Sequence, residues 1–197
     1  MKKTIWIPIV GGLLLGALSF LISASNITIQ VSQDLNLGPW EIFNTISAAL
    51  FGPIGFLITQ LGMDLGGYLY LLKDVSAGSQ NINFVLCGYV AHSASLMIVA
   101  FGYRYIYQRM KMPKLLAGWS LTLGIYYIVL AILQVFLYNI FIPDLEATYA
   151  FYFRNIPVEL ILIIVITSLI LLALPERYRR PQWSESKSGT PSTEKQA

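Results

Sequence analysis

The chain has 197 residues, of which 56% are hydrophobic and only 12% are charged. Soluble proteins contain about 25% charged residues, so this chain has too little polar surface to cover a water-exposed fold. Its net charge of +3 is small, which argues against a nucleic-acid-binding function. The only cysteine, Cys87, excludes an internal disulfide framework and a multi-cysteine metal site. The composition therefore indicates an all-α integral membrane protein whose apolar side chains lie in the lipid bilayer.

The first apolar segment covers residues 5–22 and follows Lys2 and Lys3. It is long enough to span a bilayer, whereas the core of a secretory signal runs about 7 to 15 residues. We therefore expect a retained transmembrane helix rather than a cleaved signal. Gly12 and Gly16 are four residues apart in this segment, a spacing that lets helices approach closely in lipid. Their face is expected either to dock a partner subunit or to pack within the chain.

The loop after this segment, residues 23–39, contains a short period-two pattern. Apolar and polar residues alternate over residues 27–32. This alternation is typical of a β-strand, and it predicts a short strand able to act as a lid.

The second apolar block, residues 40–72, is interrupted by Gly52 and Pro53. A continuous helix of this length would measure about 50 Å, which exceeds the thickness of a bilayer. Proline removes a backbone donor and restricts the residue before it. We therefore predict two short helices joined at Gly52-Pro53. A second pair of glycines, Gly62 and Gly66, gives the later of these helices a small-residue face.

Three further segments, residues 84–105, 115–141 and 158–174, are long enough to span, which gives six transmembrane helices within residues 1–180. This count places every basic residue except Lys73 and Arg154 on one side, as expected for the cytoplasmic face of the cell membrane. Both termini are then cytoplasmic, and residues 181–197 form a disordered tail. A re-entrant hairpin over residues 40–72 would give the same sidedness, so charge does not separate it from two full crossings.

No motif for catalysis is present. The sequence lacks the GxxxxGK[ST] motif that binds nucleotide triphosphates, the HExxH motif and the GxSxG motif. We therefore do not expect an enzyme, a cofactor or a metal site, and any ATP-driven work requires a partner chain.

Ionisable residues inside the apolar segments are the first candidates for function, because a charge in hydrocarbon is costly. They are Asp64, His92 and Glu159. Asp64 is expected near the middle of the membrane, either as a functional group or as a hydrogen-bonding tie between helices.

Polar and aromatic residues also recur at helical spacing on the last three predicted helices. The stripes lie at matching depth toward the outer face, which predicts a pocket for a small molecule rather than contacts that only join helices. Asn155 and Pro157 are in addition typical of a helix start. The predicted substrate-binding residues are Asn81 and His92 on the fourth helix, Gln134 and Tyr138 on the fifth, and Asn155 and Glu159 on the sixth.

Residues 44–55, with the sequence NTISAALFGPIG, and the following Gly62-Met63-Asp64-Leu65 resemble the short second and third helices of the substrate-binding S components of energy-coupling factor (ECF) transporters. The resemblance implies six helices and capture of vitamins or related micronutrients. It further implies a membrane coupling subunit and ATPase subunits on other chains. It also implies that small residues of the first helix, here Gly12 and Gly16, contact the coupling subunit, although the family more often has alanines there.

We therefore expect a substrate-capture subunit for micronutrient uptake, in which a small molecule enters from outside between the fourth, fifth and sixth helices and the outer loops close over it. Two other functions stay open. One is a membrane scaffold or assembly protein, in which His92 and Glu159 only brace helices. The other is a stand-alone proton-coupled carrier, with Asp64 or Glu159 as the proton site.

Overall fold

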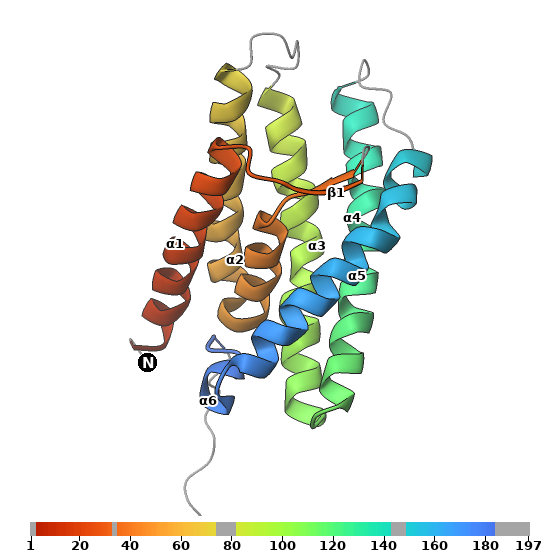
Figure 1. Cartoon of the computed structure of the whole chain (residues 1–197). Coiled ribbons are helices and arrows are strands. Elements are labelled where there is room, and N and C mark those ends of the chain that lie inside the picture. The colour runs from red at the N-terminus through yellow and green to blue at the C-terminus, as the bar shows by residue number, and fades with distance from the viewer. Residues whose placement is uncertain (1–2, 33–34, 74–81, 143–148, 184–197) are drawn as a thin grey trace, which may run out of the picture.

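The computed structural model describes residues 3–32, 35–73, 82–142 and 149–183. The described chain is a helical bundle with one small antiparallel β-hairpin (Figure 1). Its elements in chain order are α1 (Lys3–Ala24), β1 (Ile29–Ser32), β2 (Leu35–Leu37), α2 (Trp40–Lys73), α3 (Ile82–Arg109), α4 (Lys114–Phe141), α5 (Tyr149–Ala173) and α6 (Glu176–Arg179).

Five helices of the described chain are long and apolar enough to cross a membrane. They are α1 to α5, one fewer than the six helices predicted from the sequence, because residues 40–72 lie in one element, α2, that has a non-helical turn at Gly52. Many large apolar side chains on these helices are exposed on the outside of the bundle, such as Leu14 on α1 and Leu121 on α4. Lipid is the solvent that suits such a surface, so the chain has the architecture of a multi-pass membrane protein.

Helix α2 turns back on itself at Gly52. This residue has a φ of 66°, which is outside helical geometry and favours glycine, and Pro53 follows it. Two hydrogen bonds join the residues before the turn to those after it: Asn44 Nδ2 donates to Gln60 Oε1 at 2.7 Å, and Thr59 Oγ1 donates to Ser47 Oγ at 2.8 Å. In a continuous helix, residues 44 and 60 would be about 24 Å apart. The two halves of α2 therefore lie antiparallel, side by side.

Helix α1 packs in parallel against the second half of α2, and glycines line this contact. A Cβ atom added to Gly12 would lie 2.7 Å from the carbonyl oxygen of Gly55, and one added to Gly62 would lie 2.2 Å from that of Gly16. Such close backbone approach is what small residues at four-residue spacing allow. Because Gly12 and Gly16 are buried against α2, the expected partner-docking face is instead an internal contact.

Helices α3 and α4 form an antiparallel pair, and α5 crosses them obliquely (Figure 1). The first half of α2 fills the centre of the bundle, where residues 44–50 are all buried. Trp119 of α4, which is fully buried, donates through Nε1 to Thr167 Oγ1 of α5 at 2.9 Å. This bond ties α5 to the rest of the bundle.

The segment after α6 closes the bundle under the turn of α2. The ring of Trp183 lies against Gly52, and Arg104 stacks on the same ring at 5.1 Å from its centroid. The Gln182 backbone N–H donates to the Leu50 carbonyl at 2.7 Å. A break in a helix leaves such carbonyls without a partner in their own helix. Residues 181–183, which the sequence analysis assigned to a disordered tail, are therefore part of the fold; residues 184–197 lie outside the described chain.

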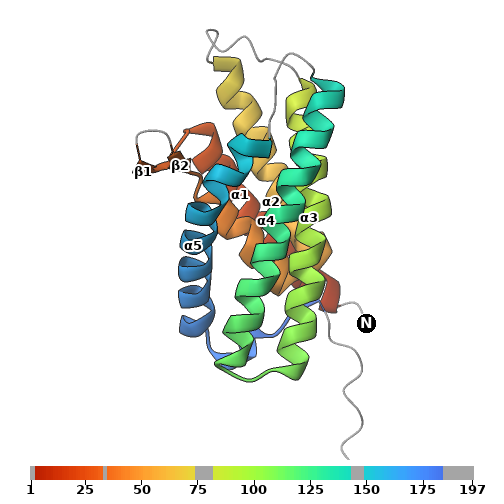
Figure 2. The same cartoon turned by 90° about the vertical axis from the view of Figure 1, so that its right-hand side faces the viewer.

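The short strand predicted from alternation in residues 27–32 is β1, and it pairs with β2. This hairpin stands out from the helices in the half of the bundle opposite α6 (Figure 2). Gly38 and Pro39 connect it to α2, which begins at Trp40, so the hairpin sets the entry of the chain into α2.

Candidate ligand-binding site

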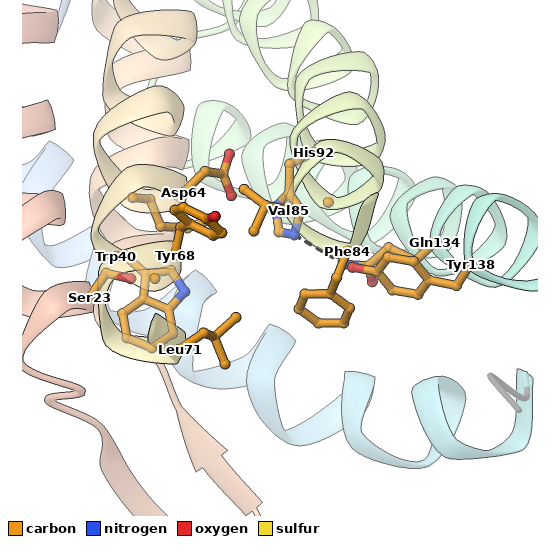
Figure 3. Close-up of a pocket in the computed structure, with 13 residues that line it drawn as sticks. Ser23, Trp40, Asp64, Tyr68, Leu71, Phe84, Val85, His92, Gln134 and Tyr138 are labelled. Atoms are coloured by element: carbon orange, nitrogen blue, oxygen red, sulfur yellow. Dashed lines mark hydrogen bonds between the residues drawn. The ribbon is translucent and has the colours of Figure 1, made fainter. Parts of the chain in front are cut away.

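A partly open cavity of about 250 Å³ lies at the end of the bundle away from α6 (Figure 3). Its walls come from the end of α1, both halves of α2, α3 and α4. The lining residues combine aromatic, apolar and a few polar side chains, as ligand pockets do. They are Ser23, Trp40, Met63, Asp64, Gly67, Tyr68, Leu71, Phe84, Val85, Gly88, His92, Gln134 and Tyr138.

His92 is held from both sides by polar partners. Its Nδ1 lies 3.3 Å from Glu41 Oε1, and its Nε2 lies 3.1 Å from Gln134 Nε2. When Nδ1 donates to the Glu41 carboxylate, Nε2 is the acceptor and the Gln134 amide nitrogen donates to it. Glu41 also accepts a hydrogen bond from the Tyr126 hydroxyl at 3.0 Å. The imidazole is thereby fixed in one orientation at the cavity wall.

Glu41 accepts hydrogen bonds from both His92 and Tyr126 and so joins α2 to α3 and α4. It lies in the first turn of α2, where the positive end of the helix dipole favours a carboxylate. The side chain is buried, so its two bonds from His92 and Tyr126 replace the water that it loses. Removal of either partner leaves a buried carboxylate incompletely paired.

A second chain of hydrogen bonds positions Asp64 at the cavity. Gln60 Nε2 donates to Asp64 Oδ2 at 2.9 Å, and Gln60 Oε1 accepts from Asn44 Nδ2 at 2.7 Å. The Gln60 amide is therefore locked at both ends, across the two halves of α2. In this set of hydrogen bonds the Asp64 carboxyl is bound only by the neutral Gln60 amide. No positive group in it balances a negative charge on Asp64.

Aromatic rings form two opposite walls of the cavity (Figure 3). Trp40 and Tyr68 come from α2, while Phe84 of α3 and Tyr138 of α4 stack on each other at 5.1 Å with an interplanar angle of 8°. The Tyr138 hydroxyl lies over Gly88, where an added Cβ would come within 3.4 Å.

The structure brings together three of the residues predicted to bind substrate. His92, Gln134 and Tyr138 all line the cavity, and Asp64 joins them from α2. Asn81 lies outside the described residues, and Asn155 lies in α5 with its side chain outside them.

Glu159, the remaining predicted residue, does not line the cavity. It lies within electrostatic range of Glu41 and the Tyr126–Tyr127 pair, behind the cavity wall. The described lining comes from α1 to α4. The side chains at the start of α5, including Asn155, lie outside the described residues, so the predicted contribution of α5 stays a prediction.

On the α2 side of the cavity, sequence reasoning named Asp64 but missed the other lining residues and Glu41. Glu41 stands at the edge of an apolar block, where an acid usually only faces water, and its contact with His92 depends on how α2 packs on α3. A usable signal was present in Trp40-Glu41, because an acidic residue beside a tryptophan at the start of a buried helix requires a partner. Tyr68 and Phe84 carried no signal that separates them from ordinary membrane-facing aromatics.

In the described part of the chain, no three His, Cys, Asp or Glu residues are grouped so that they could hold a metal ion. The polar groups that face the cavity are suited to hydrogen bonding and charge pairing, and the rings to stacking.

Comparisons of the chain with protein-family models, with curated proteins and with solved structures gave no match.

Proposed function

We propose that this chain is the substrate-capture subunit of a micronutrient uptake transporter of the ECF type. The observation that carries the proposal is the cavity at one end of the bundle, in which Asp64, His92 and Gln134 are held by partly buried hydrogen bonds. Hydrogen bonds that only join helices do not require a cavity beside them, whereas a binding site does. The cavity also lies beside the start of α2, directly after the β-hairpin, and that hairpin can close over a bound molecule.

We further propose that the two halves of α2 enter the membrane separately, either as two short crossings or as a re-entrant hairpin. In either arrangement the chain crosses the membrane an even number of times between the start of α1 and the end of α3. This places α6 and the turn between α3 and α4, both rich in Arg and Lys, on the cytoplasmic side of the cell membrane. The cavity is then open to the outside, as capture of an external nutrient requires.

The energy for uptake would come from other chains. The sequence contains no motif for binding a nucleotide triphosphate, so ATPase subunits and a membrane coupling subunit must be supplied in trans. Since Gly12 and Gly16 face α2, the coupling subunit would contact other residues, on the exposed side of α1.

Binding to the purified chain tests this proposal. A panel of water-soluble vitamins is screened for thermal stabilisation of the detergent-solubilised protein, and we expect at least one to raise the unfolding temperature. Gln134→Ala should weaken that binding by about tenfold, because it removes a cavity group and frees His92. Leu121→Ala on the same helix is the matched control, since Leu121 is 67% exposed and lies away from the cavity.

The other functions give different results. A scaffold shows no stabilisation by any vitamin, and Gln134→Ala then affects only folding. A stand-alone carrier takes up substrate in proteoliposomes that contain this chain alone, driven by a proton gradient.

A further inference from the structure

The volume of the cavity limits the size of its ligand. Pockets for drug-sized molecules are about 300 to 1,000 Å³, and this one is about 250 Å³. A ligand with one or two rings fits, whereas a large macrocyclic cofactor does not.

The shape of the walls favours a flat ring. Trp40 and Tyr68 approach from α2, and the stacked Phe84 and Tyr138 face them from α3 and α4 (Figure 3). A planar aromatic group between these walls gains offset or edge-to-face contacts on both sides. An aliphatic ligand of the same size would make weaker contacts with the same rings.

The charge of the cavity favours a cation. Asp64 lines it with only the Gln60 amide as a hydrogen-bond partner among the described residues, and no described lining residue is a lysine or an arginine. Glu41 stands behind His92, so even a protonated imidazole would balance only one of the two carboxylates. Asp64 is partly buried at the cavity wall, where a positive charge stabilises its carboxylate, and electron-rich ring faces also attract cations.

The same groups disfavour an anion. Both ring nitrogens of His92 are already engaged, Nδ1 with Glu41 and Nε2 with Gln134. The imidazole therefore has no free N–H to offer a carboxylate or a phosphate, and Asp64 would repel either one.

From this geometry we propose that the site takes a small organic cation that carries an aromatic ring, with the ring between the aromatic walls and the positive group at Asp64. The inference rests on the proposed capture function and names the chemical class of its substrate.

Three indole derivatives that share one ring system and differ in charge test the proposal: tryptamine, a cation; tryptophol, which is neutral; and indole-3-acetate, an anion. Binding of each to the full-length protein in detergent is measured by calorimetric titration. We expect tryptamine to bind about tenfold more tightly than tryptophol, and indole-3-acetate to bind most weakly. The comparison uses the native protein, so it does not depend on the folding of a variant.

Two variants then test whether Asp64 causes the preference for tryptamine over tryptophol. Asp64→Asn should reduce the difference between tryptamine and tryptophol to about threefold or less, because it removes the charge but keeps a polar side chain. Glu176→Gln makes the same chemical change on the exposed helix α6, away from the cavity, and should leave the preference unchanged.

The results separate this inference from the function on which it rests. If tryptophol or indole-3-acetate binds as tightly as tryptamine, or if Asp64→Asn keeps the full preference, the cationic class is wrong and the binding cavity is retained. If none of the three probes binds, the inference is also overturned, and the vitamin screen decides independently whether the chain captures a ligand.

Discussion

Replacement of Gly62 by alanine tests the tight contact between α1 and α2. The added Cβ would lie 2.2 Å from the Gly16 carbonyl oxygen, whereas ordinary van der Waals contacts begin at 3.4 Å, so the two helices must separate by roughly the 1.2 Å difference. Overpacking of this kind costs about 1–3 kcal/mol. Part of this cost is offset, because alanine stabilises a helix by about 0.5–1 kcal/mol relative to glycine. We expect a net destabilisation of about 1–2 kcal/mol.

Thermal unfolding of the detergent-solubilised protein measures the effect. For a chain of this length, 1 kcal/mol corresponds to about 2–4 °C in the unfolding temperature. The control is Gly124→Ala on α4, where an added Cβ meets nothing within 4 Å. It should leave the unfolding temperature unchanged or raise it slightly. If both variants unfold at the same temperature, the glycines do not set the approach of α1 to α2.

Two other pairs of variants test the buried contacts by the same unfolding assay. Tyr126→Phe removes a donor to the buried Glu41 carboxylate and should destabilise by about 1.5–3 kcal/mol. Tyr127→Phe removes a hydroxyl that has no partner among the described residues and should be neutral or stabilising; equal losses would contradict the assigned bond. Trp183→Ala should cost about 2–3 kcal/mol because it empties the space under the α2 turn. Trp6→Ala, whose side chain is 64% exposed, should have little effect, and a larger loss at Trp6 would refute the packing of Trp183.

Local signals in the sequence were sufficient for the elements of the fold. Hydropathy and length predicted apolar helices, although the sequence count was six and the structure has five such elements. The difference is the block at residues 40–72, where a glycine and a proline predicted the break that the structure has as a turn at Gly52 within α2. The close glycine contact was also predictable, but not its partner. A small-residue spacing shows that some helix comes close and does not say which one.

Half of the site could be predicted, and the other half could not. The spacing of His92 on one helix and of Gln134 and Tyr138 on the next put each on a polar face, and these faces do meet at the cavity. The contributions of Glu41 and Asp64 depend on the antiparallel pairing within α2 and on its packing against α3. Neither relation is encoded in a local repeat, so sequence reasoning did not predict that α2 forms one side of the cavity.

The contact between Gln182 and Leu50 has a consequence for biosynthesis. The ribosome releases the turn at Gly52 long before Gln182 and Trp183, which cover it and follow all the other described elements in the sequence. Until then the Leu50 carbonyl lacks this backbone donor. The described bundle is therefore completed only after residue 182 has left the ribosome, and a chain truncated before it would lack this closing contact.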